Sequence, residues 1–275
     1  MIRTILRDLW ISRELFLQLV RRDLKLRYRQ AIMGFAWALF LPVLTISAGL
    51  ILRMAFEHNG GSGAAPSLGG IAIKSWAWAF FAGAMNFATV SLLANASLVT
   101  KIYFPREVLP LSAIVAQGVD SGFGLAILLL VGYWLGFHWS LQVLWLPVLI
   151  LALLLLTTGL AFLFACANLF FRDVKYILQV LLTFGIFFTP VLFEPAMFST
   201  RVGHLLMLNP LTPILEGLRL TLVERTSLLH ALYTPAGALV WSPWELAYAL
   251  LSGAACVLVG MVAFRRSAAH FAEYY

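Results

Sequence analysis

Six long apolar runs constrain the fold of this chain more than any other feature. The most apolar run, residues 144–171, contains no Asp, Glu, Lys or Arg, and residues 35–52 form an 18-residue run that is also free of charge. A helix needs about 20 residues to cross the hydrocarbon core of a bilayer. We therefore predict six transmembrane helices, at residues 35–52, 76–97, 111–137, 144–171, 177–193 and 246–264.

Composition agrees with lipid as the main solvent. Hydrophobic residues make up 62% of the chain and charged residues 11%, and the mean hydropathy is +0.92. A soluble domain carries about a quarter charged residues to cover its surface. The length suits one compact bundle rather than several domains.

The net charge of +7 reflects where the basic residues lie. Eight of the nineteen Lys and Arg residues fall within the first 29 positions, as expected for a segment at an anionic cytoplasmic leaflet and not for a nucleic-acid interface. Residues 2–25 place apolar and aromatic side chains on one helical face and basic side chains on the other, which predicts an amphipathic helix at the membrane interface. A helix packed on a soluble domain is the alternative.

The distribution of basic residues also predicts orientation. Fourteen of the nineteen lie in segments that face the cytoplasm if the N-terminus is inside, so both termini are expected there. Residues 194–241 contain four prolines and only short apolar runs, which favours re-entrant helices over an ordinary surface loop. Residues 59–63 predict a flexible loop outside the membrane. The predicted fold class is thus an all-α membrane protein with six transmembrane helices, an N-terminal interfacial helix and re-entrant helices between spans five and six.

The sequence offers no catalytic constellation. It has no G-x-x-x-x-G-K-[ST] loop, so we predict no nucleotide site. The five histidines show no metal-ligand spacing, and we predict no metal. Cys166 and Cys256 lie inside apolar runs, so we predict no disulfide.

Two polar features, an acid within the third span and the loop between the second and third spans, are candidates for a functional role. Asp120 is an acid within the third span, near Gln117 and Ser121. We interpret it as an interior residue that hydrogen-bonds to polar neighbours, with a proton-coupled role as the alternative. The loop at residues 98–110 combines aromatic and charged side chains, as in an element that inserts into a groove on a cytoplasmic partner or, alternatively, an interfacial turn.

Several strings resemble the membrane subunit of ABC-2-type polysaccharide exporters, the group that moves O-antigen, capsule or teichoic acid polymers. They occur in order along nearly the whole chain and are RDLKLRYRQ at 22–30 running into MGFAWA at 33–38 and Pro42, KIYFPREVLP at 101–110, Asn168 with FRDV at 171–174, FFTPV at 187–191 and NPLT at 209–212. No match covers residues 60–70. Five matches in order are specific, although each alone is weak.

The resemblance implies one ABC-2 transmembrane domain over residues 1–275, with an interfacial and gate segment at 1–30 and a membrane bundle at 31–275. It implies a homodimer in the bacterial inner membrane that carries two separate ATPase subunits, which bind ATP and Mg²⁺, so that this chain needs no cofactor. The cargo would be a polysaccharide of lipopolysaccharide biosynthesis such as O-antigen, linked to undecaprenyl. The ATPase-coupling residues would be Lys101, Tyr103, Phe104, Pro105, Arg106 and Glu107, and the gate residues Arg27, Tyr28 and Arg29. Residues 194–241 would cap the outer side of the pore.

Aromatic side chains suit such a cargo because sugar rings have apolar faces that stack on them. The candidates for the channel lie in spans two and five and are Trp76, Trp78, Phe80, Phe81, Phe87, Phe184, Phe187 and Phe188. Interfacial belts and core packing are the alternative for each single residue. Two other functions stay open, an ABC-2 permease for a drug or small lipophile and a membrane-embedded glycan enzyme.

Overall fold

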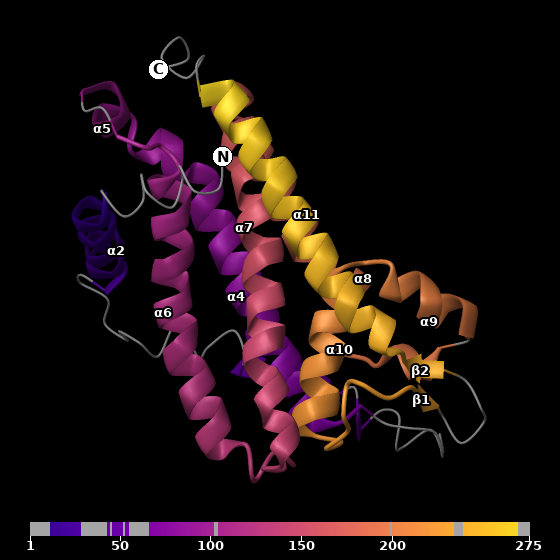
Figure 1. The fold of residues 1–275 in the computed structure, drawn as a ribbon. Coiled ribbons are helices and arrows are strands. Elements are labelled where there is room, and N and C mark those ends of the chain that lie inside the picture. The colour runs from indigo at the N-terminus through magenta and orange to yellow at the C-terminus, as the bar shows by residue number, and fades with distance from the viewer. Residues whose placement is uncertain are drawn as a thin grey trace.

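The computed structural model describes residues 12–28, 43–44, 46–51, 53–54, 66–101, 104–198, 200–233 and 239–268. Its long helices stand side by side in a bundle, with α5 at one end and two short strands toward the other (Figure 1). We refer to these as the α5 end and the β-strand end. A helix satisfies all its backbone hydrogen bonds internally, which apolar surroundings require.

Among the described residues, four helices are long and apolar enough to cross a membrane. They are α4 (Leu68–Ala94), α6 (Val108–Val131), α7 (Leu146–Phe170), which follows the 3-10 helix η1 (Leu141–Trp145), and α11 (Pro243–Ala268). They confirm the second, third, fourth and sixth predicted spans. The first, residues 35–52, lies largely outside the described residues, although 43–44 and 46–51 are helical.

The fifth predicted span is shorter than expected. Helix α8 (Val174–Phe188) has 15 residues, or about 22 Å at 1.5 Å per residue. It ends because Thr189 adopts extended backbone angles (φ −110°, ψ 135°) before Pro190, and the residue before a proline disfavours the helical region. The predicted fifth span, residues 177–193 with an interruption at Pro190, therefore extends beyond the observed end of the helix at Phe188.

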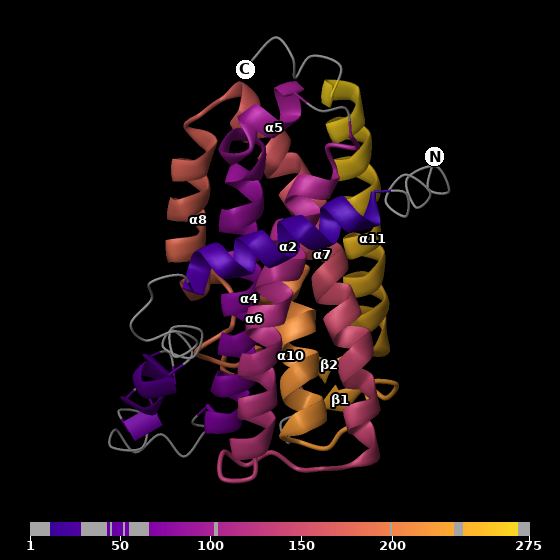
Figure 2. The ribbon, with the colours of Figure 1, turned by 90° about the vertical axis from the view of Figure 1, so that its left-hand side faces the viewer.

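Helix α2 (Arg13–Tyr28) crosses the bundle instead of running along it (Figure 2). It packs on α6, with Leu19 and Val20 buried and Arg21 and Lys25 exposed. It ends three residues later than the predicted helix, whose residues 2–11 lie outside the described part. The short helix α5 (Ala96–Lys101) follows α4 at the α5 end.

The region at residues 194–241 is folded. It contains η2 (Pro195–Met197), α9 (Thr200–Met207), α10 (Leu211–Leu222), β1 (Leu232–Tyr233) and β2 (Leu239–Trp241). The antiparallel pairing of β1 with β2, Leu232 opposite Trp241, was not predicted. All twelve residues of α10 are buried, among α4, α7 and α11, so this helix is not part of an ordinary surface loop.

Two buried apolar clusters hold the bundle. The larger one joins α4, α7 and α10 over most of the bundle, and the smaller one at the α5 end includes Leu19, Val99, Phe162 and Phe264. Helices α7 and α11 cross closely at Gly159, where any Cβ would overlap the α11 backbone. Small residues allow such close helix contacts in membranes, where lipid provides no hydrophobic drive for association.

Candidate functional site

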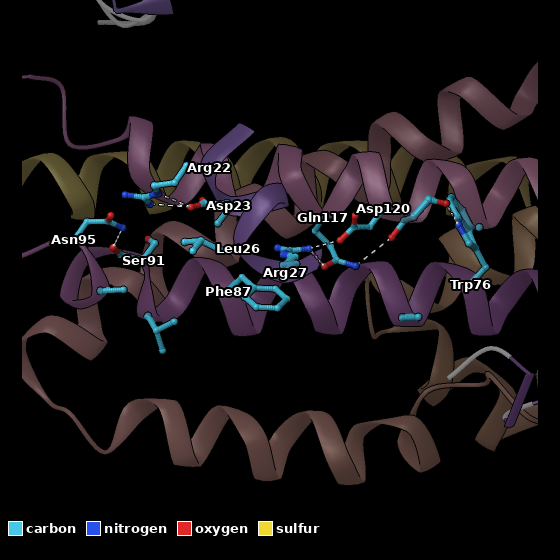
Figure 3. A pocket seen from close by; sticks show the side chains of 16 residues that line it. Arg22, Asp23, Leu26, Arg27, Trp76, Phe87, Ser91, Asn95, Gln117 and Asp120 are labelled. Atoms are coloured by element: carbon cyan, nitrogen blue, oxygen red, sulfur yellow. Dashed lines mark hydrogen bonds and ion pairs between the residues drawn. The ribbon is translucent and has the colours of Figure 1, made fainter. Parts of the chain in front are cut away.

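A cavity of about 840 Å³ lies where α2 crosses α4 and α6 (Figure 3). Each helix contributes side chains at helical spacing, so one face of each helix points into the cavity. From α2 these are Arg22, Asp23, Leu26 and Arg27; from α4 Trp76, Ala79, Phe87, Val90, Ser91 and Ala94, with Asn95 just after it; from α6 Ala113, Gln117, Asp120, Ser121 and Gly124.

The pairing of Arg27 with Asp120 is the central interaction of this cavity. The Arg27 Nη1 atom donates to Asp120 Oδ2 at 2.5 Å and to Gln117 Oε1 at 2.8 Å. The Arg27 guanidinium carbon also lies 3.8 Å from the centroid of the Phe87 ring. Asp120 is 5% exposed, so its charge is compensated inside the protein, as buried charges require.

The interpretation of Asp120 as a hydrogen-bonded interior residue is confirmed, but its cationic partner was not predicted. Arg27 and Asp120 were singled out separately, one as a gate residue and one as an intramembrane acid. A buried acid in an apolar span calls for a countercharge. Nothing in the sequence indicates which of the nineteen basic residues supplies it.

Polar groups continue toward both ends of the cavity. Near the α5 end, Asn95 Nδ2 donates to the Ser91 carbonyl at 2.7 Å. Toward the β-strand end, Trp76 Nε1 donates to the Ser121 carbonyl at 2.7 Å, and Gln117 Nε2 donates to Ser121 Oγ at 3.3 Å. The lining therefore combines amide, hydroxyl and aromatic groups with small residues that leave space.

The predicted channel aromatics do not lie together in the described part of the chain. Trp76 and Phe87 line the cavity, whereas Trp78, Phe80 and Phe81 are in the buried core. On α8, by contrast, three candidates point outward, with exposed fractions of 57, 62 and 74% for Phe184, Phe187 and Phe188. Whether any of them contacts cargo stays a prediction.

The predicted coupling loop lies at the α5 end. Phe104, Pro105 and Arg106 are half-buried, and Phe104 packs on the smaller apolar cluster. Glu107 is buried and accepts a hydrogen bond of 2.9 Å from Arg265 Nε, which ties this loop to α11. The side chains of Lys101 and Tyr28, and all of Tyr103 and Arg29, lie outside the described residues. Sequence reasoning did not indicate Arg265.

The comparisons with known proteins agree with the resemblance seen in the sequence. Residues 14–223 match the model of the family described as ABC-2 type transporter. The chain belongs to this family. Over 220 residues it is 30% identical to the O-antigen export system permease protein RfbA of Myxococcus xanthus, covering 79% of this chain and 83% of that protein. Two proteins of the same name from Klebsiella pneumoniae are each 24% identical over 208 residues, which are 75% of this chain and 79% of each relative.

Family membership makes this chain a multi-pass membrane permease subunit without an ATPase domain of its own. Such subunits carry no cofactor and work with partnering ATPase subunits. These findings confirm the predicted assignment to the family and the prediction that this chain is not the ATPase.

Proposed function

We propose that this chain is the permease subunit of an ABC transporter that exports a polysaccharide such as O-antigen across the bacterial cytoplasmic membrane. It acts as a homodimer with two ATPase subunits, and the glycan enters linked to undecaprenyl. The observation that carries this proposal is the similarity to O-antigen export permeases over three quarters of the chain.

The cavity under α2 supports a glycan cargo. Its walls carry the Trp76 and Phe87 rings, which suit the apolar faces of sugars, and amide and hydroxyl groups that suit sugar hydroxyls. Inside the cavity Arg27 and Asp120 form an ion pair, so these two residues add no net charge to its lining. Many weak contacts of this kind allow a polymer to slide.

The α5 end is assigned to the cytoplasm because most basic residues fall in segments that face that side. The loop at residues 101–107 then docks on the ATPase, and its Glu107–Arg265 contact passes motion to α11. The β-strand end faces outward. There α9 and α10 form the re-entrant pair, because α10 is buried yet, with 12 residues, too short to cross.

The test is deletion of the gene in the source bacterium, followed by a gel and immunoblot of surface polysaccharide. Loss of the surface glycan together with intracellular accumulation of the lipid-linked polymer is the expected result. Complementation by the wild-type chain should restore display only when the partner ATPase retains its P-loop lysine. Normal surface glycan in the deletion strain would refute the cargo.

A small lipophile is the competing cargo. Proteoliposomes that contain the permease and its ATPase distinguish the two, because a drug permease shows ATP-dependent uptake of a fluorescent lipophile into inside-out vesicles. We expect no such uptake, and ATPase stimulation by lipid-linked glycan instead.

A further inference from the structure

A second group of charged side chains lies away from the cavity, in the β-strand half of the bundle. It joins the first turns of α4, the middle of α10 and the segment that precedes η2. Its members are Lys74, Glu194, Glu216, Arg219 and Glu224. The side chains of Lys74 and Glu216 are 0% exposed and that of Arg219 is 3% exposed, so these charges are sealed from water.

Arg219 is the centre of this group. Its Nη2 atom lies 2.5 Å from Glu216 Oε1 and its Nη1 atom 3.3 Å from Glu194 Oε2, and Nη1 also donates to Glu224. Glu194 in turn accepts hydrogen bonds from the backbone and hydroxyl of Ser67, at 3.2 Å each. Arg219 thus joins α10 to Glu194, which precedes η2, and to Glu224, which follows α10 in the chain.

Lys74 provides the second link. Its Nζ atom donates to the Phe193 carbonyl at 2.6 Å and lies 4.0 Å from Glu216 Oε2. Glu216 Oε2 is buried and makes no hydrogen bond in the described structure, so it faces Lys74 through charge alone. Among the four most buried groups, two cations balance two carboxylates, while Glu224 lies at the exposed rim with 43% exposure.

Gly70 on α4 makes room for this arrangement. A Cβ placed on Gly70 would lie 2.5 Å from Ser67 Oγ and 2.9 Å from both Cγ and Cδ of Arg219. The arginine stem therefore rests directly on the α4 backbone. A methyl group at this position would displace Arg219 and the Ser67 hydroxyl that donates to Glu194, without changing any charge.

We propose that Lys74, Glu216 and Arg219 form a clamp that holds α10 in a closed position at the outer end of the pore. Apolar packing between helices tolerates sliding, whereas ion pairs at fixed positions set a register, which is the best-supported role of buried charges. This inference rests on the proposed function, because it takes α10 as part of the outer cap of an export pore. The three side chains act as positioning residues through α10 and do not touch the cargo.

The test measures passive sucrose efflux from proteoliposomes that contain the permease with its ATPase subunits and no nucleotide. The double variant Lys74→Met/Glu216→Gln removes one cation and one carboxylate together, so no buried charge is left uncompensated. We expect its efflux to rise about tenfold, as when the open population rises by that factor. The single variant Lys74→Arg keeps the positive charge opposite Glu216, and its efflux should stay as low as that of the wild type.

The matched control is Arg201→Gln, which neutralises an exposed cation on α9 outside the clamp and should leave efflux unchanged. A double variant that assembles normally and shows the same sucrose efflux as the wild type would overturn the clamp. The cluster would then serve only to balance its buried charges. If the double variant does not assemble, Gly70→Ala decides: higher efflux supports the clamp and unchanged efflux overturns it.

Failure of the clamp and failure of the proposed cargo give different results. Sucrose efflux requires no glycan, and glycan display in cells requires no leak. A tight double variant in a strain that still exports glycan would refute the clamp only. A leaky double variant of a permease that exports no glycan would refute the cargo only.

Discussion

Replacing Arg27 by methionine removes the cation that faces Asp120 and keeps most of the side-chain volume. Two opposite charges whose centres lie about 4 Å apart attract by about 4 kcal/mol at an effective dielectric constant near 20. The contact of the guanidinium with the Phe87 ring adds about 0.5–1 kcal/mol. Breaking one side of a buried pair costs about 3–5 kcal/mol, and we expect about 3 kcal/mol because the pair borders a cavity.

The opposite replacement, Asp120→Asn, should cost less. The Arg27 side chain is 15% exposed, compared with 7% for Asp120, so the arginine can turn toward water while the carboxylate cannot. Its remaining contact with Gln117 also persists. We expect about 1.5–2 kcal/mol, the lower part of the range for a hydrogen bond to a charged group.

The assay is thermal unfolding of the purified permease in detergent, followed by tryptophan fluorescence and size exclusion. Since 1 kcal/mol shifts Tm by about 2–4 °C in chains of this size class, Arg27→Met should lower Tm by about 6–12 °C. The double variant Arg27→Met/Asp120→Asn should be more stable than Arg27→Met alone. Arg22→Met is the control on the same helix, because the Arg22–Asp23 pair, with side chains 43 and 20% exposed, is more open to solvent than Arg27–Asp120 and contributes at most about 1 kcal/mol.

Two results would refute this reasoning. One is a double variant whose loss of stability equals the sum of the two single losses, since the charges would then not be coupled. The other is a loss for Asp120→Asn that equals or exceeds the loss for Arg27→Met.

Three further expectations follow from the packing. Gly159→Leu should abolish monodisperse protein on a sizing column because a side chain would overlap the α11 backbone, whereas Gly122→Leu, with open space around its Cβ position, should give normal yield. Arg265→Met should lower glycan export per ATP hydrolysed and cost about 1–3 kcal/mol in stability, since it removes the hydrogen bond that the buried Glu107 carboxylate accepts from Arg265. Phe80→Ala should destabilise by about 3–5 kcal/mol, as a core truncation does, whereas Phe187→Ala should leave Tm near wild type and lower export if that ring contacts cargo.

Apolar run length predicted the spans well because it reports directly on what a helix must bury. The ends were less accurate, both where a charged residue interrupted the run and where a proline ended the helix early. The second span was predicted to begin at Trp76, but α4 begins at Leu68 and includes Lys74. Lys74 is tolerated there because Phe193 and Glu216 satisfy it, and those partners are more than a hundred residues away in the sequence.

The site was predictable residue by residue but not as an arrangement. The sequence indicated the motif at residues 22–30 and the acid in the third span separately. The Arg27–Asp120 contact joins them across 93 positions. The α10 charges were missed because residues 194–241 were interpreted from proline and run length alone. Pairings of this kind depend on tertiary packing, which one sequence does not specify.

Helix α4 connects the two charged sites to the predicted coupling loop. One end of its 27 residues carries Lys74, its middle lines the cavity, and it leads into α5 at Asn95. Asn95 departs from helical geometry (φ −115°, ψ 27°), yet its side chain donates to the Ser91 carbonyl, which braces this joint against the last turn of α4. At 1.5 Å per residue the 27 residues of α4 span about 40 Å, so this one helix reaches from the Lys74 group to the start of α5. The joint at Asn95 is held by its side-chain bond to Ser91 and by backbone hydrogen bonds from Leu98 and Val99 to the Asn95 carbonyl, so α4 and α5 are joined by more than apolar packing.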